Sequence, residues 1–295
     1  ISITYLMYAY QAKLFYLHRF FTVSIIIAIA QFCLFYTFPG LSTILGPTNI
    51  SEMIWGEYST PTLTNFYAVF GSIIRVSGLS REAGFFASML ICVIILCYME
   101  YKKYNIKISK LYFVMLCVAY VISFSKMSFL IIPAILCIKC RKIIDRIPKF
   151  ATIVSLLIFF IIIWYHSDFL AKEENVTFTH RFGAYGVMPD INDVVNLLFG
   201  SPELSSHDFD YLYAKKYINV LEGYPSFAGM GGYIISNGLL LTGILLIILC
   251  NTGISSTGIL LLFLLTMNVQ MDTNQNFVVL AYFIAFKFFY KKNNH

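Results

Sequence analysis

Hydrophobic runs separated by short polar gaps make up most of this chain. A helix needs about 20 apolar residues to cross the hydrocarbon core of a bilayer. The pattern predicts membrane-spanning helices at residues 19–38, 84–100, 110–124, 127–140, 150–166, 229–250, 254–270 and 275–290. Residues 1–10 look like the tail of a further span, so we expect N-terminal spans that are missing from this numbering. The predicted fold class is all-α: a polytopic α-helical membrane protein of about 8–9 transmembrane helices in a single membrane-embedded domain, residues 1–295.

Two long polar gaps interrupt the apolar pattern, at residues 39–83 and 167–228. The first contains several Pro and Gly residues, which break regular structure, and aromatic residues that suit a membrane interface. In the second we predict two short helices. Asp190 can cap a helix that runs to Leu198, and residues 206–221 form an amphipathic helix that lies on the membrane or covers a cavity.

The charged residues are sorted around these apolar runs. Most of the 21 Lys and Arg lie in four short patches, and most of the 15 Asp and Glu lie in the other gaps. Short loops rich in Lys and Arg stay in the cytoplasm, so residues 39–83 are predicted to be a first outward-facing loop and residues 167–228 a large one. Because the basic patches flank apolar runs, the net charge of +6 indicates membrane topology and no nucleic-acid partner. A content of 59% hydrophobic and 12% charged residues excludes a water-soluble protein of this length.

The residues best suited to chemistry begin where the first loop re-enters the membrane. The segment RVSGLSRE places Arg75, Arg81 and Glu82 within eight residues. A charge near the bilayer centre costs at least ~2.5–3.5 kcal/mol, so these groups should face one another or a wet cavity. Arg donates hydrogen bonds in pairs and therefore suits phosphate. The alternative is structural: Glu82 caps the next helix, where the dipole favours a negative charge, and pairs with an arginine.

Lys126 stands alone among apolar residues between the two short spans at 110–124 and 127–140. We expect these spans to meet at a tight, buried turn. Two interpretations of the lysine are open. It lines a cavity for an anionic ligand, or its long side chain reaches the outer membrane interface as a snorkelling lysine.

Three histidine or acidic groups in the large loop are further candidates. His180 and Arg181 could offer a base beside a phosphate-binding group, or they are a solvated pair. His207 is a rival base, or a residue at the start of a helix. Asp208 and Asp210 spell the DxD of metal-dependent sugar transferases. The outer face offers no nucleotide sugar for a metal to hold, so no metal is expected.

Two other features are expected to be structural. Glycines enter the span after the large loop, and small residues let helices approach closely. These residues are Gly229, Gly231, Gly232, Gly238 and Gly243. The polar outer turn around Asp272, which includes Asn268 and Gln270, is expected to be solvated.

In this order, the candidate residues resemble the bacterial O-antigen polymerase (Wzy) family and its relatives, the O-antigen ligases. The family has an Arg, a Gly and then Glu-Pro before a span, which is similar to RVSGLSREAGFF here, with Ala83 in place of Pro. A Ser-Arg turn between two spans resembles the Ser-Lys pair that ends at Lys126. An Arg early in a large periplasmic loop resembles Arg181, and an LLFG stretch at 197–200 and a Gly-rich span follow. The resemblance covers about residues 70–250.

The resemblance implies a membrane glycosyltransferase at the periplasmic face of the bacterial inner membrane. It would move a growing glycan from undecaprenyl pyrophosphate onto the next lipid-linked repeat unit, with no nucleotide sugar and no cofactor. The residues expected to hold the pyrophosphate are Arg75, Arg81, Lys126 and Arg181. The catalytic base is expected to be Glu82, which we favour, or else His180 or His207. Expected partners are the undecaprenyl-pyrophosphate-linked oligosaccharide, membrane lipid, a chain-length regulator protein and a flippase.

Two other functions stay open. An O-antigen ligase hands the finished glycan to lipid A core and usually depends on a His late in the large loop, a place that His207 could fill. A lipid-linked glycan transporter or flippase would have internal repeats and charged residues near the midplane of broken helices. No repeat stands out in this sequence, and the charges collect at the predicted outer edge.

Overall fold

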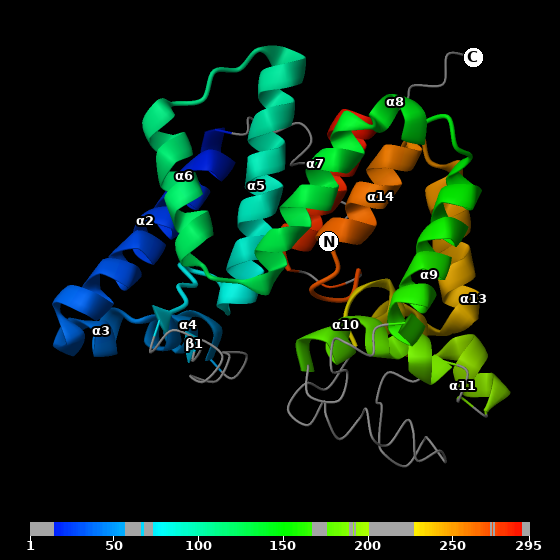
Figure 1. Ribbon diagram of the computed structural model, residues 1–295, viewed down its shortest axis with the longest axis horizontal. Helices are drawn as coiled ribbons and strands as arrows, with labels where there is room; N and C mark the ends of the chain where they lie inside the picture. The colour runs from blue at the N-terminus through cyan, green and yellow to red at the C-terminus, as the bar shows by residue number, and fades with distance from the viewer. Residues whose placement is uncertain are drawn as a thin grey trace. The chain divides into compact units, whose positions relative to one another are not determined.

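The computed structural model of the protein describes residues 15–56, 66–67, 73–166, 176–188, 191, 193–200, 227–271, 273 and 275–290. This part of the chain is mostly helical, with one pair of two-residue strands (Figure 1). The all-α class predicted from the sequence is therefore confirmed. The chain divides into two compact units, unit 1 (residues 1–135) and unit 2 (residues 136–295), and each is described in turn.

Unit 1 is built on three apolar helices: α2 (Phe15–Thr37), α5 (Ala83–Tyr104) and α6 (Lys110–Ile122). Helix α6 packs against both of the others. Helix α5 is apolar on all sides, and nearly all of its side chains up to Glu100 are buried. A helix that is hydrophobic all round is the one that other elements cover, so α5 forms the core of this unit.

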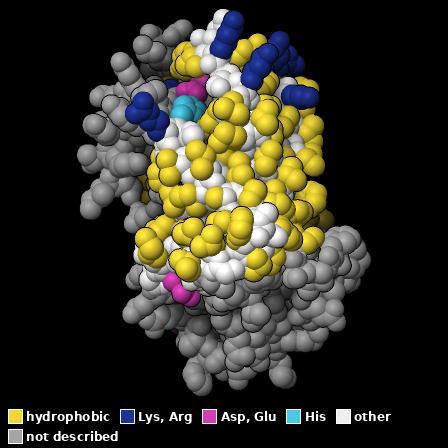
Figure 2. Space-filling view, turned by 90° about the vertical axis from the view of Figure 1, so that its left-hand side faces the viewer, with side chains coloured by type: hydrophobic (Ala, Val, Ile, Leu, Met, Phe, Trp, Pro, Cys, Tyr) yellow, Lys and Arg dark blue, Asp and Glu magenta, His cyan; other side chains and the backbone are white. Residues whose placement is uncertain are grey.

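One end of unit 1 is basic. Helix α5 finishes there and α6 begins, and the exposed side chains include Lys102, Lys103, Lys107 and Lys110. At the same end, the Nε2 atom of His18 in α2 lies 3.0 Å from a carboxylate oxygen of Glu100 in α5. Figure 2 shows the face of this unit that carries α2 and α6: hydrophobic side chains cover its middle, and Lys and Arg side chains gather at one end.

The other end of unit 1 contains short regular elements in the first loop. Helices α3 (Pro39–Leu45) and α4 (Pro47–Trp55) both begin with proline, whose missing N–H is not needed in a first helical turn. Strand β1 (Phe66–Tyr67) pairs antiparallel with β2 (Ile73–Ile74). The expectation that Pro breaks regular structure here is wrong, because these prolines start helices.

The junction after α6 is the tight turn that the sequence predicts. The 3-10 helix η3 (Lys126–Leu130) follows α6 and packs against α5. Ser123 and Ser125 are buried in the junction. Helix α7 (Ile131–Lys139) then leads the chain into unit 2.

Unit 2 contains two long apolar helices, α9 (Lys149–His166) and α13 (Gly229–Asn251). Helix α14 (Ser256–Leu265) packs against α9 and against α15 (Asn276–Phe289). Helix α13 is interrupted at Gly238, whose φ of 72° is not helical. The break lies inside a segment that the sequence predicts as one continuous span.

Two helices of the large loop are described. Helix α10 (Val176–Val187), which the sequence did not predict, packs against α9 and α13. Helix α11 (Val194–Phe199) packs against α13 and is capped by Asp193, not Asp190: the Asp193 carboxylate accepts a backbone hydrogen bond at 2.9 Å. The amphipathic helix predicted at residues 206–221 lies outside the described residues.

Within the described part of the chain, four helices are long and apolar enough to cross a membrane: His18–Thr37, Ala83–Tyr104, Lys149–His166 and Gly229–Asn251. They coincide with four of the predicted spans. Helices α6, α14 and α15 are apolar but shorter than the about 20 residues that a straight crossing needs. The larger number of spans and the periplasmic side of the loops stay predictions.

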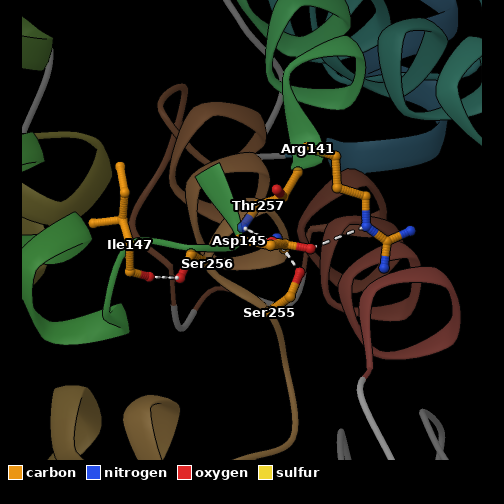
Figure 3. Close-up of polar contacts among 7 residues, drawn as sticks. Arg141, Asp145, Ile147, Ser255, Ser256 and Thr257 are labelled. Carbon is orange, nitrogen blue, oxygen red and sulfur yellow. Dashed lines mark hydrogen bonds and ion pairs between the residues drawn. The ribbon is translucent and has the colours of Figure 1, made fainter. Parts of the chain in front are cut away.

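A polar cluster, the Asp145 cluster, joins three parts of unit 2 (Figure 3). Asp145 follows α8 (Arg141–Ile144) and accepts a hydrogen bond from Arg141 at 3.1 Å. Its other carboxylate oxygen accepts from the backbone N–H of Thr257 at 3.0 Å. Ser255, beside Thr257, donates its backbone N–H to the last turn of α15. The cluster therefore connects the basic segment before α9 with the loop before α14 and with the end of α15.

Candidate functional site

The Arg75–Glu82 turn leads from β2 into α5, and one buried side chain of α2 fastens it. The Oε1 atom of Gln31 accepts hydrogen bonds from the backbone N–H groups of Ser77, at 3.3 Å, and Gly78, at 3.0 Å. Its Nε2 donates to the Gly78 carbonyl at 3.3 Å. Burying an amide costs free energy unless it is hydrogen-bonded, and here the turn supplies the partners.

Gly78 occupies the apex of this turn for a steric reason. Its φ is +55°, a conformation that glycine adopts without penalty. A Cβ atom at this position would lie 2.6 Å from the carbonyl oxygen of Ser24 in α2. The Ser24 hydroxyl accepts the backbone N–H of Leu79 at 3.1 Å. The turn therefore lies directly on α2.

Helix α4 holds the turn from a second direction. The hydroxyl of Ser51 donates to the carbonyl of Arg81 at 2.7 Å, and the indole N–H of Trp55 donates to the carbonyl of Leu79 at 3.1 Å. All of these contacts reach the backbone of the turn from uncharged side chains. Side chains of α2 and α4 therefore hold the backbone of the turn from two directions.

The two arginines of the turn are half-buried. The guanidinium carbon of Arg81 lies 5.7 Å from the centroid of the Phe85 ring, within the range of a cation–π contact. Its Nε is buried and has no hydrogen-bond partner among the described residues. Arg75 and Arg81 stand three residues before and three residues after Gly78, so both guanidiniums are carried by the same fastened apex.

Glu82 lies where the turn becomes helix α5. It is the N-cap residue, and its carbonyl accepts the backbone N–H of Phe86 at 3.0 Å. Its side chain makes no capping hydrogen bond, and its pairing with an arginine stays a prediction. The structure brings one carboxylate and two guanidiniums together on one turn.

Lys126 is the exposed first residue of η3. The hydroxyl of Ser125 caps η3 by accepting the backbone N–H of Met127 at 3.2 Å. Figure 1 shows the junction of α6 and α7 at the end of unit 1 where α5 begins, and η3 packs against α5. Lys126 therefore lies at the same end of unit 1 as the Arg75–Glu82 turn.

In unit 2, Arg181 of α10 binds a buried amide. One terminal nitrogen of its guanidinium donates to the Oδ1 atom of Asn268 at 2.6 Å. The carbonyl of His180 accepts the backbone N–H of Ala228, just before α13, at 2.7 Å. The alternative of a solvated His180–Arg181 pair is wrong, because both residues belong to a helix that is packed into unit 2.

The polar turn after α14 is the part of this region that the sequence misjudged. Asn268 is buried, and the side chain of Gln270 donates to the hydroxyl of Ser236 in α13 at 2.7 Å. The backbone N–H of Gly229 donates to Val269 at 3.0 Å. The sequence did contain a signal for this arrangement, because amide side chains in an otherwise apolar stretch are expected to be buried with hydrogen-bond partners.

The glycines of α13 confirm the predicted close approach of helices at Gly231, against α10, and at Gly238, against α11. A Cβ at Gly231 would lie 2.7 Å from that of Ala184 in α10, and one at Gly232 would overlap the Phe227 carbonyl. At the break, a Cβ on Gly238 would overlap the Leu198 carbonyl of α11. Backbone from α11 packs directly against the break.

The sequence-predicted site residues divide between the two units. Unit 1 brings Arg75, Arg81 and Glu82 onto one turn and places Lys126 at the same end. Unit 2 holds His180 and Arg181 on α10. His207 lies outside the described residues, and the convergence of all the cations on one pyrophosphate stays a prediction. Two partners were not predicted: Gln31 for the turn and Asn268 for Arg181.

Among the described residues, no three His, Cys, Asp or Glu side chains lie close enough together to hold a metal ion. Comparison of the whole chain with known protein families, with characterised proteins and with solved structures finds no match.

Proposed function

We propose that this chain is a polymerase of O-antigen or a similar surface polysaccharide. It transfers an undecaprenyl-pyrophosphate-linked glycan onto the next lipid-linked repeat unit, at the periplasmic face of the inner membrane. The observation that carries the proposal is the Arg75–Glu82 turn. Two guanidiniums and a carboxylate sit on a backbone that uncharged side chains hold in place. The order of motifs along the sequence supports the same function.

The reaction requires two kinds of group. The hydroxyl of the acceptor sugar attacks the anomeric carbon of the donor glycan, and the bond from that carbon to the pyrophosphate oxygen breaks. Negative charge then develops on the departing lipid pyrophosphate, where preorganised cations stabilise it. The cations are Arg75 and Arg81, with Lys126 at the same end of unit 1, and the part that Arg181 of unit 2 takes in the same step stays a prediction from the sequence. Arg binds phosphate through paired donors.

The acceptor hydroxyl loses its proton to a base. Glu82 is the preferred base because the turn carries it beside the two arginines, so the proton acceptor and the cations share one rigid support. His180 and His207 are the other candidates. The half-buried position of Glu82 at the start of α5 gives it access to a substrate that approaches the turn.

Alanine variants at the cations test the proposal. In source cells that lack the native gene, Arg75→Ala, Arg81→Ala or Arg181→Ala should abolish long-chain surface glycan while the protein still reaches the membrane. Lys107→Ala is the matched control, because Lys107 is an exposed cation at the opposite end of unit 1. Polymer of normal length from the arginine variants would refute the proposal.

The deletion strain separates the polymerase from its nearest rival. Loss of a polymerase leaves lipid A core capped with a single repeat unit, whereas loss of an O-antigen ligase leaves bare core. A gel of the extracted lipopolysaccharide reads this directly. Bare core in the deletion strain would assign the chain as a ligase.

A further inference from the structure

We infer that Gln31, in the middle of α2, is the positioning residue that sets the geometry of the two arginines; the inference rests on the proposed function. Gln31 is buried inside one of the four helices that are long and apolar enough to cross a membrane. An uncompensated amide in such a helix is unfavourable. Its presence there is explained by what it binds.

The single side chain of Gln31 makes three hydrogen bonds, and all three go to the apex of the Arg75–Glu82 turn. Its oxygen accepts from Ser77 and Gly78, and its nitrogen donates to the carbonyl of Gly78. The amide thus binds both the N–H and the C=O of Gly78. A residue whose N–H and C=O groups are both hydrogen-bonded has little freedom left in φ and ψ.

The position of the apex determines where the arginines lie. Gly78 is three residues from Arg75 and three residues from Arg81. A change in the backbone angles at the apex rotates the two halves of the turn against each other, and with them the two guanidiniums. Recognition of a pyrophosphate by paired donors requires the donors to be held within about 0.5 Å of the productive geometry. The Gln31 amide provides that constraint without adding charge to the site.

The substitution Gln31→Met tests the role, because methionine keeps the length and burial of the side chain and removes its hydrogen bonds. Purified protein is reconstituted in vesicles with lipid-linked repeat units. The initial polymerisation rate is measured against the concentration of those units, and against inorganic pyrophosphate as an inhibitor. We expect the KM for lipid-linked units and the inhibition constant of pyrophosphate both to rise about tenfold, the scale of one misplaced charged hydrogen bond.

Glu100→Gln is the matched control. Glu100 pairs with His18, so it also ties α2 to α5, but at the opposite end of the same unit. If Gln31 acted only through the stability of unit 1, the two variants would change KM and pyrophosphate inhibition alike. Equal effects of the two variants, or an unchanged pyrophosphate inhibition constant in Gln31→Met, would overturn the inference.

Two further variants allow the result to be interpreted if Gln31→Met fails to fold or if the proposed function is wrong. Ser24→Ala removes one hydrogen bond, to the N–H of Leu79, and should raise the same two constants by a smaller factor if Gln31→Met fails to fold. Arg81→Ala separates the two levels of the proposal. Normal polymerisation in Arg81→Ala refutes the proposed function. Loss of polymerisation in Arg81→Ala with wild-type constants in Gln31→Met and Ser24→Ala refutes only the positioning role.

Discussion

The Arg75–Glu82 turn of unit 1 and the Asp145 cluster of unit 2 both place charged residues beside helix ends, but they use the charges in opposite ways. In the turn, uncharged groups such as Gln31 bind the backbone, and the charged side chains are carried on it. In the cluster, the Asp145 carboxylate is itself the acceptor that joins Arg141 to the first turn of α14. A charged side chain that itself joins two segments is structural. A charged side chain on a backbone that other side chains hold in place can bind a ligand.

The same distinction explains the two acids that depart from the charge pattern of the chain. Most Asp and Glu fall in the predicted outer loops, but Glu100 and Asp145 lie beside basic patches. Each contacts a basic side chain: Glu100 lies 3.0 Å from the Nε2 atom of His18, and Asp145 forms an ion pair with Arg141 at 3.1 Å. Both acids therefore belong to the structural class, although they occur among lysines and arginines.

Removing one charged side chain from the turn and one from the cluster should give the largest effects on polymer yield and on stability. Arg81→Ala is expected to reduce polymer yield by about 100-fold or more, the loss seen when a group that stabilises transition-state charge is removed. Its free energy of unfolding should change by less than about 1 kcal/mol. Asp145→Ala should do the reverse: a loss of about 1.5–3 kcal/mol, with normal polymer yield per folded molecule. Thermal unfolding in detergent and glycan gels measure the two quantities, and parallel changes in both variants would remove the distinction.

The apex of the turn gives the next largest effect. Gly78→Ala is expected to cost about 2–3 kcal/mol, because the positive φ is strained for alanine and the new Cβ meets the Ser24 carbonyl. The polymer yield should fall together with the free energy of unfolding. Gly243→Ala in α13 is the control, since nothing lies within 4 Å of a Cβ there. A Gly78→Ala protein that is as stable and as active as Gly243→Ala would show that the turn tolerates a different geometry.

The long helices could be predicted from the sequence because a crossing requires a long apolar run, and no distant residue changes that requirement. The short elements could not. Helix α10 was missed because Thr177 to Arg181 look polar. Its aromatic residues Phe178, Phe182 and Tyr185 repeat at helical spacing. Phe178 stacks on Trp164 of α9, with ring centroids 5.9 Å apart, and this contact is part of the apolar cluster that buries the helix.

The charged residues of the candidate site could also be predicted, because a charge beside an apolar run is conspicuous in any sequence. Their supports could not. Gln31 precedes Gly78 by 47 residues, and Asn268 follows Arg181 by 87. A single polar residue in an apolar helix indicates that a partner exists, but only the fold identifies the partner. The sequence pattern therefore identifies the charged residues of the candidate site, and the packing of the fold identifies the residues that hold them in place.

Acid should weaken the Asp145 cluster by a moderate amount. Burial raises the pKa of the Asp145 carboxyl, but hydrogen bonds from the Thr257 backbone, Ser255 and Arg141 outweigh it, so the pKa lies below its ordinary value. A group with a depressed folded-state pKa stabilises the protein above its unfolded pKa, near 4, and this contribution is lost as the pH falls through the folded value. Unfolding of the wild type should therefore become easier below about pH 4. In Asp145→Asn that part of the pH dependence should be absent, and an identical acid profile for both proteins would exclude this role.

The smallest effect is expected at Glu100, and it tests whether the distinction holds inside unit 1. Glu100→Gln keeps the shape of the side chain but replaces a carboxylate oxygen that the His18 ring contacts, so a loss of about 1 kcal/mol is expected. Polymer yield per folded molecule should not change, because the pair lies at the basic end of the unit, away from the Arg75–Glu82 turn. Unfolding and polymer assays on the same preparation read both quantities. If polymer were lost while stability stayed normal, a contact between an acid and a neighbouring basic side chain would no longer mark that acid as structural, and Asp145 would have to be reconsidered as well.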